Sequence, residues 1–266
     1  MKGVVLITGA SSGIGRAIAL FLAEKGYLVI GASRSGSGGD SAGLRNVQMD
    51  VTDLASVQAM MLSIQNEFGC LHAVINSAGL GMLGSIEDST PEEVEALFRT
   101  NLMGVHHVCR NALDLLRSAK SGYIINITSM AAQMGLPYRG IYCASKFAVE
   151  GYSEALSYEV AADGIRVVLV EPGDVRTDIN TNRKVVGAVS KRHLTNHQAL
   201  QHQINREVED GLSPQAVAAC IYRILNTDKP RLRYRVAKPQ AKLAYYLMRL
   251  LPDRVFEAIV MKHYNV

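Results

Sequence analysis

The stretch that decides the fold is VVLITGASSGIG, residues 4–15. Its first four residues are a continuous apolar run, which is typical of a strand that is buried on both faces. Glycines follow at once, and Ile18 and Leu22 then recur at helical spacing. A strand, a glycine turn and a helix in this order predict a βαβ opening and therefore a parallel sheet that is covered by helices.

The glycine turn is suited to bind a nucleotide. Gly9, Gly13 and Gly15 permit positive φ and close backbone approach, so a pyrophosphate can lie against N–H groups at the helix N-terminus. A glycine pattern alone is weak support, but a strand before it and a helix after it are the context that such a site needs. We therefore expect the turn, with Ser11, Ser12 and Ile14, to contact a cofactor. The alternative is a tight turn that binds nothing.

A second stretch, YCASK at residues 142–146, joins a phenol to an ammonium group. The apolar residues after it recur at helical spacing, so Tyr142 and Lys146 are expected one turn apart on one helix face. A free tyrosine has a pKa near ~10, and a nearby cation lowers that value by favouring the phenolate. Such a phenol can exchange a proton with a secondary alcohol or a ketone. The alternative is an ordinary amphipathic helix with two exposed polar side chains.

With these two stretches, NSAG at residues 76–79 and Ser129, thirteen residues before Tyr142, complete a pattern that resembles the short-chain dehydrogenase/reductase family. The resemblance covers residues 4–224. Within the family, residues 78–84, 135–137 and 142–151 resemble the branch that includes 17β-hydroxysteroid and retinol dehydrogenases. The resemblance implies a single α/β domain over residues 1–266, a Rossmann-like doubly wound parallel sheet of about seven strands.

The resemblance also implies catalytic roles. For a reduction, Tyr142 donates a proton to the carbonyl oxygen and Ser129 donates a hydrogen bond to it. Lys146 lowers the phenol pKa and fixes the nicotinamide ribose. Asn101 kinks its helix and holds a water that is linked to Lys146.

Further cofactor contacts follow from the same resemblance. Asp50 and Val51 are expected at the adenine. Residues Ser77, Ala78 and Gly79 are expected at the ribose, together with Tyr142 and Lys146. The family usually has Asn or no residue where Ser77 stands. A ribose contact made through the backbone would survive this departure, and one made through the side chain would not. The motif residues Pro172, Gly173, Val175 and Thr177 are expected to hold the nicotinamide end of the cofactor.

The end of the second strand indicates which nucleotide is bound. An NAD site of this type has Asp or Glu about 20 residues beyond the glycines, where the carboxylate binds the ribose 2′-hydroxyl. This chain has Arg34 and Ser35 there, and a guanidinium with hydroxyls suits a 2′-phosphate. We therefore predict NADP(H) as the preferred cofactor. NAD(H) stays the alternative, because Ser12 stands where many NADP-preferring relatives have a basic residue.

Composition limits the other classes of function. The chain has 266 residues, of which 48% are hydrophobic, enough for one large core. Four scattered cysteines and seven histidines without ligand spacing predict neither a metal site nor a disulfide framework. No export leader and no apolar run of ~18 residues is present, so we expect a cytoplasmic location. We expect no nucleic-acid partner.

The remaining elements are expected from periodicity and caps. Strands are expected at residues 27–32, 47–49, 71–75, 123–127, 165–170 and 233–236. Asp53 should cap a helix over 54–68, and Ser213-Pro214 should begin one that reaches residue 225. Thr90-Pro91 with Glu93 forms a capping box that begins a helix to about Ser118. The polar residues 178–212 are expected to form a lid over the substrate.

The C-terminal part, residues 238–266, is predicted to be a basic helical extension. Residues 229–266 hold nine Lys and Arg against Asp253 and Glu257, a net charge of +7. Leucines and Tyr246 recur there at helical spacing until Pro252. Three hypotheses remain: a helix packed on the body, a weak peripheral membrane contact, and a cover for a lipid-like substrate.

The sequence thus predicts hydride transfer between NADP(H) and a secondary alcohol or ketone of an apolar, steroid-, retinoid- or other lipid-like small molecule. The alternatives are an NADP-sensing regulator without turnover, disfavoured because no catalytic residue is lost, and a 3-oxoacyl-thioester reductase. An extended-family sugar epimerase is disfavoured by the glycine spacing. From resemblance alone, a homodimer or homotetramer is expected through the helices that carry Asn101 and Tyr142.

Overall fold

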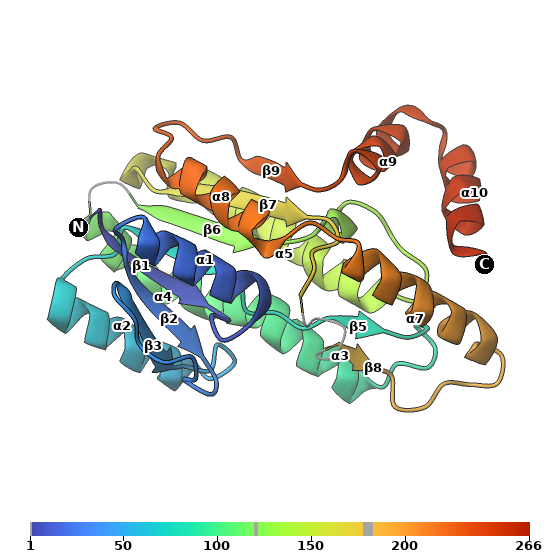
Figure 1. Ribbon diagram of the computed structural model, residues 1–266, viewed down its shortest axis with the longest axis horizontal. Helices are drawn as coiled ribbons and strands as arrows, with labels where there is room; N and C mark the ends of the chain where they lie inside the picture. The colour runs from blue at the N-terminus through green and yellow to red at the C-terminus, as the bar shows by residue number, and fades with distance from the viewer. Residues whose placement is uncertain (1, 120–121, 178–182) are drawn as a thin grey trace.

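The computed structural model describes residues 2–119, 122–177 and 183–266. A seven-stranded sheet forms its centre, with all neighbours parallel, in the order β3-β2-β1-β4-β6-β7-β9 (Figure 1). This confirms the predicted fold class. The strands are β1 (Val4–Thr8), β2 (Leu28–Ser33), β3 (Leu44–Gln48), β4 (Ala73–Asn76), β6 (Tyr123–Ile127), β7 (Arg166–Pro172) and β9 (Arg233–Val236).

Helices cover both faces of the sheet, and the opening strand shows how. Alternate residues of a strand point to opposite faces. Leu6 accordingly packs in the core under α2 (Leu54–Phe68), α4 (Gly104–Ser118) and α5 (Gly140–Glu159). Ile7 packs in the core under α1 (Gly13–Glu24) and α8 (Pro214–Leu225). The unbroken apolar run in the sequence therefore reflects a strand with no solvent face.

The glycine turn after β1 lies directly against the segment after β4. Gly9 has φ +70°, and a Cβ there would lie 2.8 Å from the backbone nitrogen of Ala78. A Cβ on Gly15 would lie 2.2 Å from the carbonyl oxygen of Gly9. The turn can therefore close only with glycine at both positions. β1 and β4 are neighbours on either side of the point where the strand order reverses, which is where sheets of this type bind ligands.

The helix that begins at Thr90 is interrupted. Its capping box is present as predicted: the Glu93 N–H donates to the Thr90 hydroxyl (3.2 Å), and the Thr90 N–H donates to the Glu93 carboxylate (3.0 Å). The expected single helix is divided into α3 (Pro91–Phe98), a π-helical turn at Arg99–Met103, and α4. Asn101 lies inside the π-helical turn and is buried.

Residues after β7 contain structure that periodicity did not reveal. A helix, α7 (Leu194–Glu209), occupies nearly half of the expected polar lid and buries Leu200, Ile204 and Val208 on one face. A small second sheet pairs β5 (Met82–Leu83) with β8 (Lys184–Val185). Residues 178–182 of the expected lid lie outside the described part of the chain. Two 3-10 turns complete the connections, Met130–Ala132 and Ala161–Asp163.

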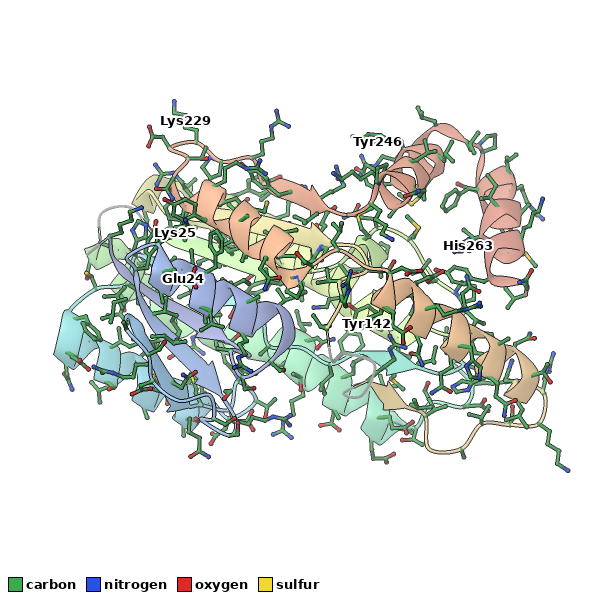
Figure 2. The ribbon with its side chains drawn as sticks, viewed as in Figure 1. Glu24, Lys25, Tyr142, Lys229, Tyr246 and His263 are labelled. Carbon is green, nitrogen blue, oxygen red and sulfur yellow. The ribbon has the colours of Figure 1, made fainter. Side chains whose placement is uncertain are left out.

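The C-terminal extension forms two helices at one end of the molecule (Figure 1), α9 (Pro239–Leu250) and α10 (Asp253–Tyr264), separated at Pro252 as predicted. Each helix is anchored by one buried tyrosine, Tyr245 on α9 and Tyr264 on α10. Figure 2 labels Tyr246 and His263 on this pair, and both are exposed. No helix in the described ranges is long and apolar enough to cross a membrane.

Candidate active site

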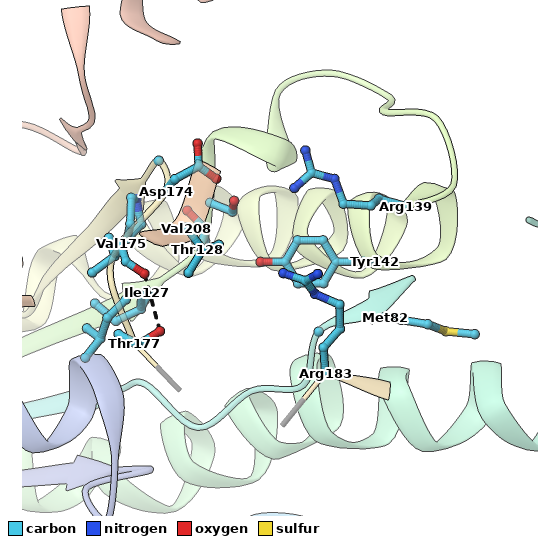
Figure 3. A pocket seen from close by; sticks show the side chains of 15 residues that line it. Met82, Ile127, Thr128, Arg139, Tyr142, Asp174, Val175, Thr177, Arg183 and Val208 are labelled. Atoms are coloured by element: carbon cyan, nitrogen blue, oxygen red, sulfur yellow. Dashed lines mark hydrogen bonds between the residues drawn. The ribbon is translucent and has the colours of Figure 1, made fainter. Parts of the chain in front are cut away.

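A cavity of about 110 Å³ lies at the carboxyl ends of β6 and β7 (Figure 3). Seven residues that the sequence singled out line it, although they come from four separate segments: Ile14, Ser129, Tyr142, Pro172, Gly173, Val175 and Thr177. A Cβ on Gly13 would lie 3.4 Å from Thr177, so the glycine turn closes one side of this cavity.

Tyr142 lies in the first turn of α5, and its hydroxyl points into the cavity (Figure 3). Burial raises its pKa above the ordinary value of a phenol, while a hydrogen bond with Ser129 and the positive charges of Arg139 and Arg183 act in the opposite direction. The net shift is upward, because desolvation outweighs the nearby charges, and a lowering of this pKa by Lys146 stays a prediction.

Lys146 follows one turn later and is 7% exposed. Its Nζ donates to the carbonyl oxygen of Ile127 at the end of β6 (3.1 Å). Burial lowers its pKa to about 8, and the charge of Glu150, a further turn along the helix, limits the shift. With this pKa the group is still mostly an ammonium at pH 7, and burial leaves its charge less screened than that of an exposed lysine.

Asn101 is 1% exposed and makes three hydrogen bonds through its side chain. Its Oδ1 accepts from the Leu80 N–H (2.7 Å), and its Nδ2 donates to the Leu80 carbonyl (3.0 Å) and to the Ser145 hydroxyl (3.0 Å). A Cβ on Gly79 would lie 3.4 Å from Asn101 Oδ1 and 3.6 Å from Lys146 Nζ. The π-helical turn therefore brings Asn101 beside the lysine and clamps the segment that follows β4.

The predicted cofactor residues follow the carboxyl ends of neighbouring strands. Arg34 and Ser35 follow β2, Asp50 and Val51 follow β3, Gly9 to Gly15 follow β1, Ser77 to Gly79 follow β4, and Pro172 to Thr177 lie at the end of β7. Because these strands are adjacent, the residues form one line across the sheet edge. The Thr8 hydroxyl joins two of these segments, since it accepts from the N–H groups of Ser77 (3.1 Å) and Ala78 (3.0 Å).

The site fits a dinucleotide. At the N-terminus of α1, Ser12 makes no side-chain cap and no acidic residue occupies the first turn, so its N–H groups are available to a phosphate. Arg34 is exposed, and within the described ranges no ion pair holds its guanidinium. Asp50 instead caps its own turn, accepting from the N–H and the hydroxyl of Thr52 (2.8 Å each).

Three charged residues in the cavity were not foreseen: Arg139, Asp174 and Arg183. Arg139 immediately precedes α5, and its Nη2 donates to the Tyr264 hydroxyl of α10 (2.9 Å). Asp174 occupies the variable position of the Pro-Gly-x-Val-x-Thr motif. Its place in that motif is the one sequence signal that could have identified Asp174 as a site residue. No such signal exists for Arg139, because a contact between residues 139 and 264 leaves no local sequence pattern.

A ladder of buried ion pairs runs from Glu150 beside Lys146 to the C-terminal helices. The Glu150 carboxylate accepts from Thr128 (2.8 Å) and from Arg233 Nε (2.9 Å). Arg235 pairs with the fully buried Glu171 (2.8 Å), and its guanidinium lies 3.6 Å above the Tyr245 ring. The basic residues of β9 are therefore structural charges and contribute little to an exposed basic surface.

The part of the chain that the structure describes holds no cluster of His, Cys, Asp or Glu that could bind a metal ion. Its four cysteines are free thiols.

The sequence of this chain is similar to known proteins over most of its length. The sequence model of the short chain dehydrogenase family matches residues 3–185. A 3-ketodihydrosphingosine reductase of Bacteroides thetaiotaomicron is 38% identical and is aligned over 99% of this chain and 98% of its own. A 3-oxoacyl-[acyl-carrier-protein] reductase of Haemophilus influenzae is 35% identical over 71% of this chain and 83% of its own.

Solved structures agree in fold over nearly the whole chain. A short-chain dehydrogenase from Streptomyces avermitilis superposes with a TM-score of 0.79 at 28% identity, covering 98% of this chain and 97% of its own. A short-chain dehydrogenase/reductase from Burkholderia phymatum, in complex with NAD, gives a TM-score of 0.80 at 27% identity, with 92% of each chain covered. The chain therefore belongs to the short-chain dehydrogenase/reductase family of oxidoreductases.

Proposed function

We propose that the protein transfers a hydride between NADP(H) and a secondary alcohol or ketone of a lipid-like molecule. The observation that carries this proposal is the grouping of Tyr142 and Ser129 at the cavity, with Lys146 one turn behind on the same helix. A sensor without turnover would not need a proton donor at the point where the nicotinamide motif also lines the wall.

Each residue has a separate role in the proposed reduction. The Tyr142 hydroxyl donates a proton to the carbonyl oxygen, and the Ser129 hydroxyl donates a hydrogen bond to the same oxygen. Lys146 holds the nicotinamide ribose and supplies positive charge behind the phenol. Asn101 fixes the segment after β4 and supports proton supply to Lys146. NADPH, when bound, supplies the hydride.

The choice of NADP(H) is supported by Arg34 and Ser35 at the end of β2, where a carboxylate would select NAD(H). The Arg34 guanidinium is exposed, forms no ion pair with a described residue and can bind a 2′-phosphate.

The proposed substrate is a long-chain ketone with a polar head group. A relative aligned over 99% of this chain is named for 3-ketodihydrosphingosine, an alkyl ketone with an adjacent amino alcohol. The cavity of about 110 Å³ is well below the roughly 300–1,000 Å³ that encloses a drug-sized ligand. A head group and ketone fit there, while the alkyl chain must leave the cavity. The second candidate is a 3-oxoacyl thioester, for which the Haemophilus relative is named.

We also propose that the protein forms a homo-oligomer through α4 and α5. Phe147 on α5 is 44% exposed and Met103 before α4 is 43% exposed, so each leaves a large apolar side chain uncovered.

The test is reduction of a ketone panel, including 3-ketodihydrosphingosine and a 3-oxoacyl thioester, followed by loss of NADPH absorbance. Tyr142→Phe should lower kcat by roughly 100-fold or more, the usual contribution of a positioned proton donor, and leave NADPH binding intact. Tyr158→Phe is the matched control, because this tyrosine is on the same helix and 70% exposed. Wild-type activity in Tyr142→Phe would refute the proposed mechanism.

A further inference from the structure

Two opposite charges face each other in the cavity without forming an ion pair. Figure 3 shows the Arg139 guanidinium and the Asp174 carboxylate directed toward each other, with Tyr142 beside them. Between these two described side chains no ion pair or hydrogen bond is formed, although each senses the charge of the other. Space for a small polar group therefore separates them.

Arg139 is held in place, and one of its buried donors has no acceptor within the described residues. Its Nη2 donates to the Tyr264 hydroxyl (2.9 Å), and its guanidinium carbon lies 6.0 Å from the centre of that ring. Its Nε is buried and has no acceptor among the residues that the structure describes. A buried N–H without an acceptor is uncommon and costly in folded proteins. This donor therefore points to an acceptor oxygen on a ligand.

The Asp174 carboxylate has no charged partner among the described side chains. Its backbone is fixed, because its carbonyl oxygen accepts from the Leu212 N–H (2.9 Å) and its amide follows the end of β7. Its carboxylate makes no hydrogen bond or ion pair with another described side chain. Burial raises its pKa, and the charge of Arg139 limits that rise. The carboxylate accepts from its own backbone N–H and senses the charges of Arg139 and Lys238 without pairing with either side chain. A cationic group on a ligand would give it the charged partner that the described side chains do not supply.

Arg183 lines the same cavity but is engaged elsewhere, since its Nη1 donates to the Asn205 side chain on α7 (3.5 Å). It contributes positive charge without offering the same geometry as Arg139. A purely anionic head group would accept from Arg139 and leave Asp174 without a cation. An apolar head group would provide a partner for neither Arg139 nor Asp174.

We propose that Arg139 and Asp174 form a head-group subsite that recognises an amino alcohol beside the ketone. The Asp174 carboxylate accepts hydrogen bonds from the ammonium group, and Arg139 Nε donates to the neighbouring hydroxyl oxygen. The ketone itself then meets the hydroxyls of Tyr142 and Ser129. Tyr264 is a positioning residue, which aims the guanidinium from α10. This inference rests on the proposed function and adds which part of the substrate is read and by which residues.

The subsite can be tested by binding, without turnover. The probes are a short-chain amino diol, which resembles the product of reduction and stays monomeric in water, and the same diol without the amine. Titration calorimetry of the wild type with NADPH present, which cannot oxidise an alcohol, should show the amino diol binding about 10- to 100-fold tighter, the scale of one charge-assisted hydrogen bond. Asp174→Asn should lose this preference. Asp210→Asn, which changes an exposed carboxylate at the end of α7, should keep it.

The two ketones that correspond to these diols, one with the amine and one without it, separate this inference from the proposed function. In the wild type, kcat/KM should favour the amino ketone over the ketone without the amine, and Asp174→Asn should bring the ratio close to one. Tyr264→Phe should raise KM for the amino ketone with little change in kcat, because it loosens Arg139 without touching the reacting atoms.

Equal binding of the two diols to the wild type, or preference for an acidic ligand, would overturn the subsite. If Asp174→Asn does not fold, the wild-type preference between the diols still decides the matter. A preference for the amino diol with no reduction of any ketone would leave the subsite standing and refute the proposed function instead.

Discussion

Replacing Asn101 by alanine should destabilise the fold by an amount that the structure allows us to work out. The side chain is 1% exposed, and its loss leaves both the N–H and the carbonyl of Leu80 without their partner. Each such group costs about 1–3 kcal/mol. Leu80 is only half-buried, so water can reach part of it and the lower end of that range applies to each group.

The Ser145 hydroxyl adds little to this sum, because it keeps its own hydrogen bond to the Tyr142 carbonyl (2.8 Å). Alanine also has the higher helix propensity, which offsets the loss by about 0.5 kcal/mol. The net expectation for Asn101→Ala is a loss of about 1.5–2.5 kcal/mol in the free energy of unfolding. For a chain of this size that corresponds to a fall of roughly 3–5 °C in Tm.

The assay is thermal and urea unfolding followed by circular dichroism. Asn111→Ala is the matched control, since this asparagine lies on α4, is half-buried, and donates only to the carbonyl of its own helix at His107 (2.7 Å). We expect the control to stay within about 0.5 kcal/mol of the wild type. Equal stability of the two variants would refute the view that the π-helical turn exists to clamp the segment after β4.

Three further predictions concern charge. The pKa of Lys146 is lowered from 10.5 to about 8, so the folded state holds this proton less tightly than the unfolded state does. Lys146→Met should therefore raise the free energy of unfolding by up to about 3 kcal/mol below pH 8, and this gain should fade as the pH rises from 8 to 10.5. The same substitution should weaken NADPH binding. A Tm difference that does not change with pH would contradict this. Arg34→Asp should weaken NADPH binding by about 2–4 kcal/mol and NADH binding little, as measured by calorimetry, and a wild type that prefers NADH would exclude the assignment. The α9–α10 pair should sediment with anionic vesicles at low salt and release at high salt; Leu250→Glu, at a residue 79% exposed, should abolish binding, whereas Leu62→Glu on α2, 57% exposed, should not. Absence of binding at low salt would leave a pair of packed terminal helices.

The sequence predicts the inner strands of the sheet well because they are buried on both faces and so appear as unbroken apolar runs, as in Val4 to Ile7. The edge strands β3 and β9 are only partly buried and lack such a run. The caps at Thr90 and Asp53 are equally local and are both present. The helix α7 was missed because its three buried apolar residues, four apart, stand among polar side chains that obscure the period.

The chemistry at Tyr142 is harder to predict, since a pKa depends on depth as well as on neighbours. The spacing of Tyr142 and Lys146 places a cation near the phenol, but the depth to which α5 is packed against the sheet reverses the expected direction of the shift. Arg139 was overlooked for a related reason. Its partner Tyr264 is 125 residues away, and only the folded chain brings them together.

The π-helical turn at Arg99–Met103 also sets the phase between two helices. A π-helical turn takes one residue more than an α-helical turn, and one residue rotates an α-helix by about 100°. Leu97 on α3 and Val105 on α4 are both buried with that extra residue in place. Deleting any one residue of this turn would restore a regular helix and turn one of these faces into solvent. Deletions in this five-residue segment should therefore be tolerated less well than substitutions. Met103, which is 43% exposed, should accept substitution but not deletion.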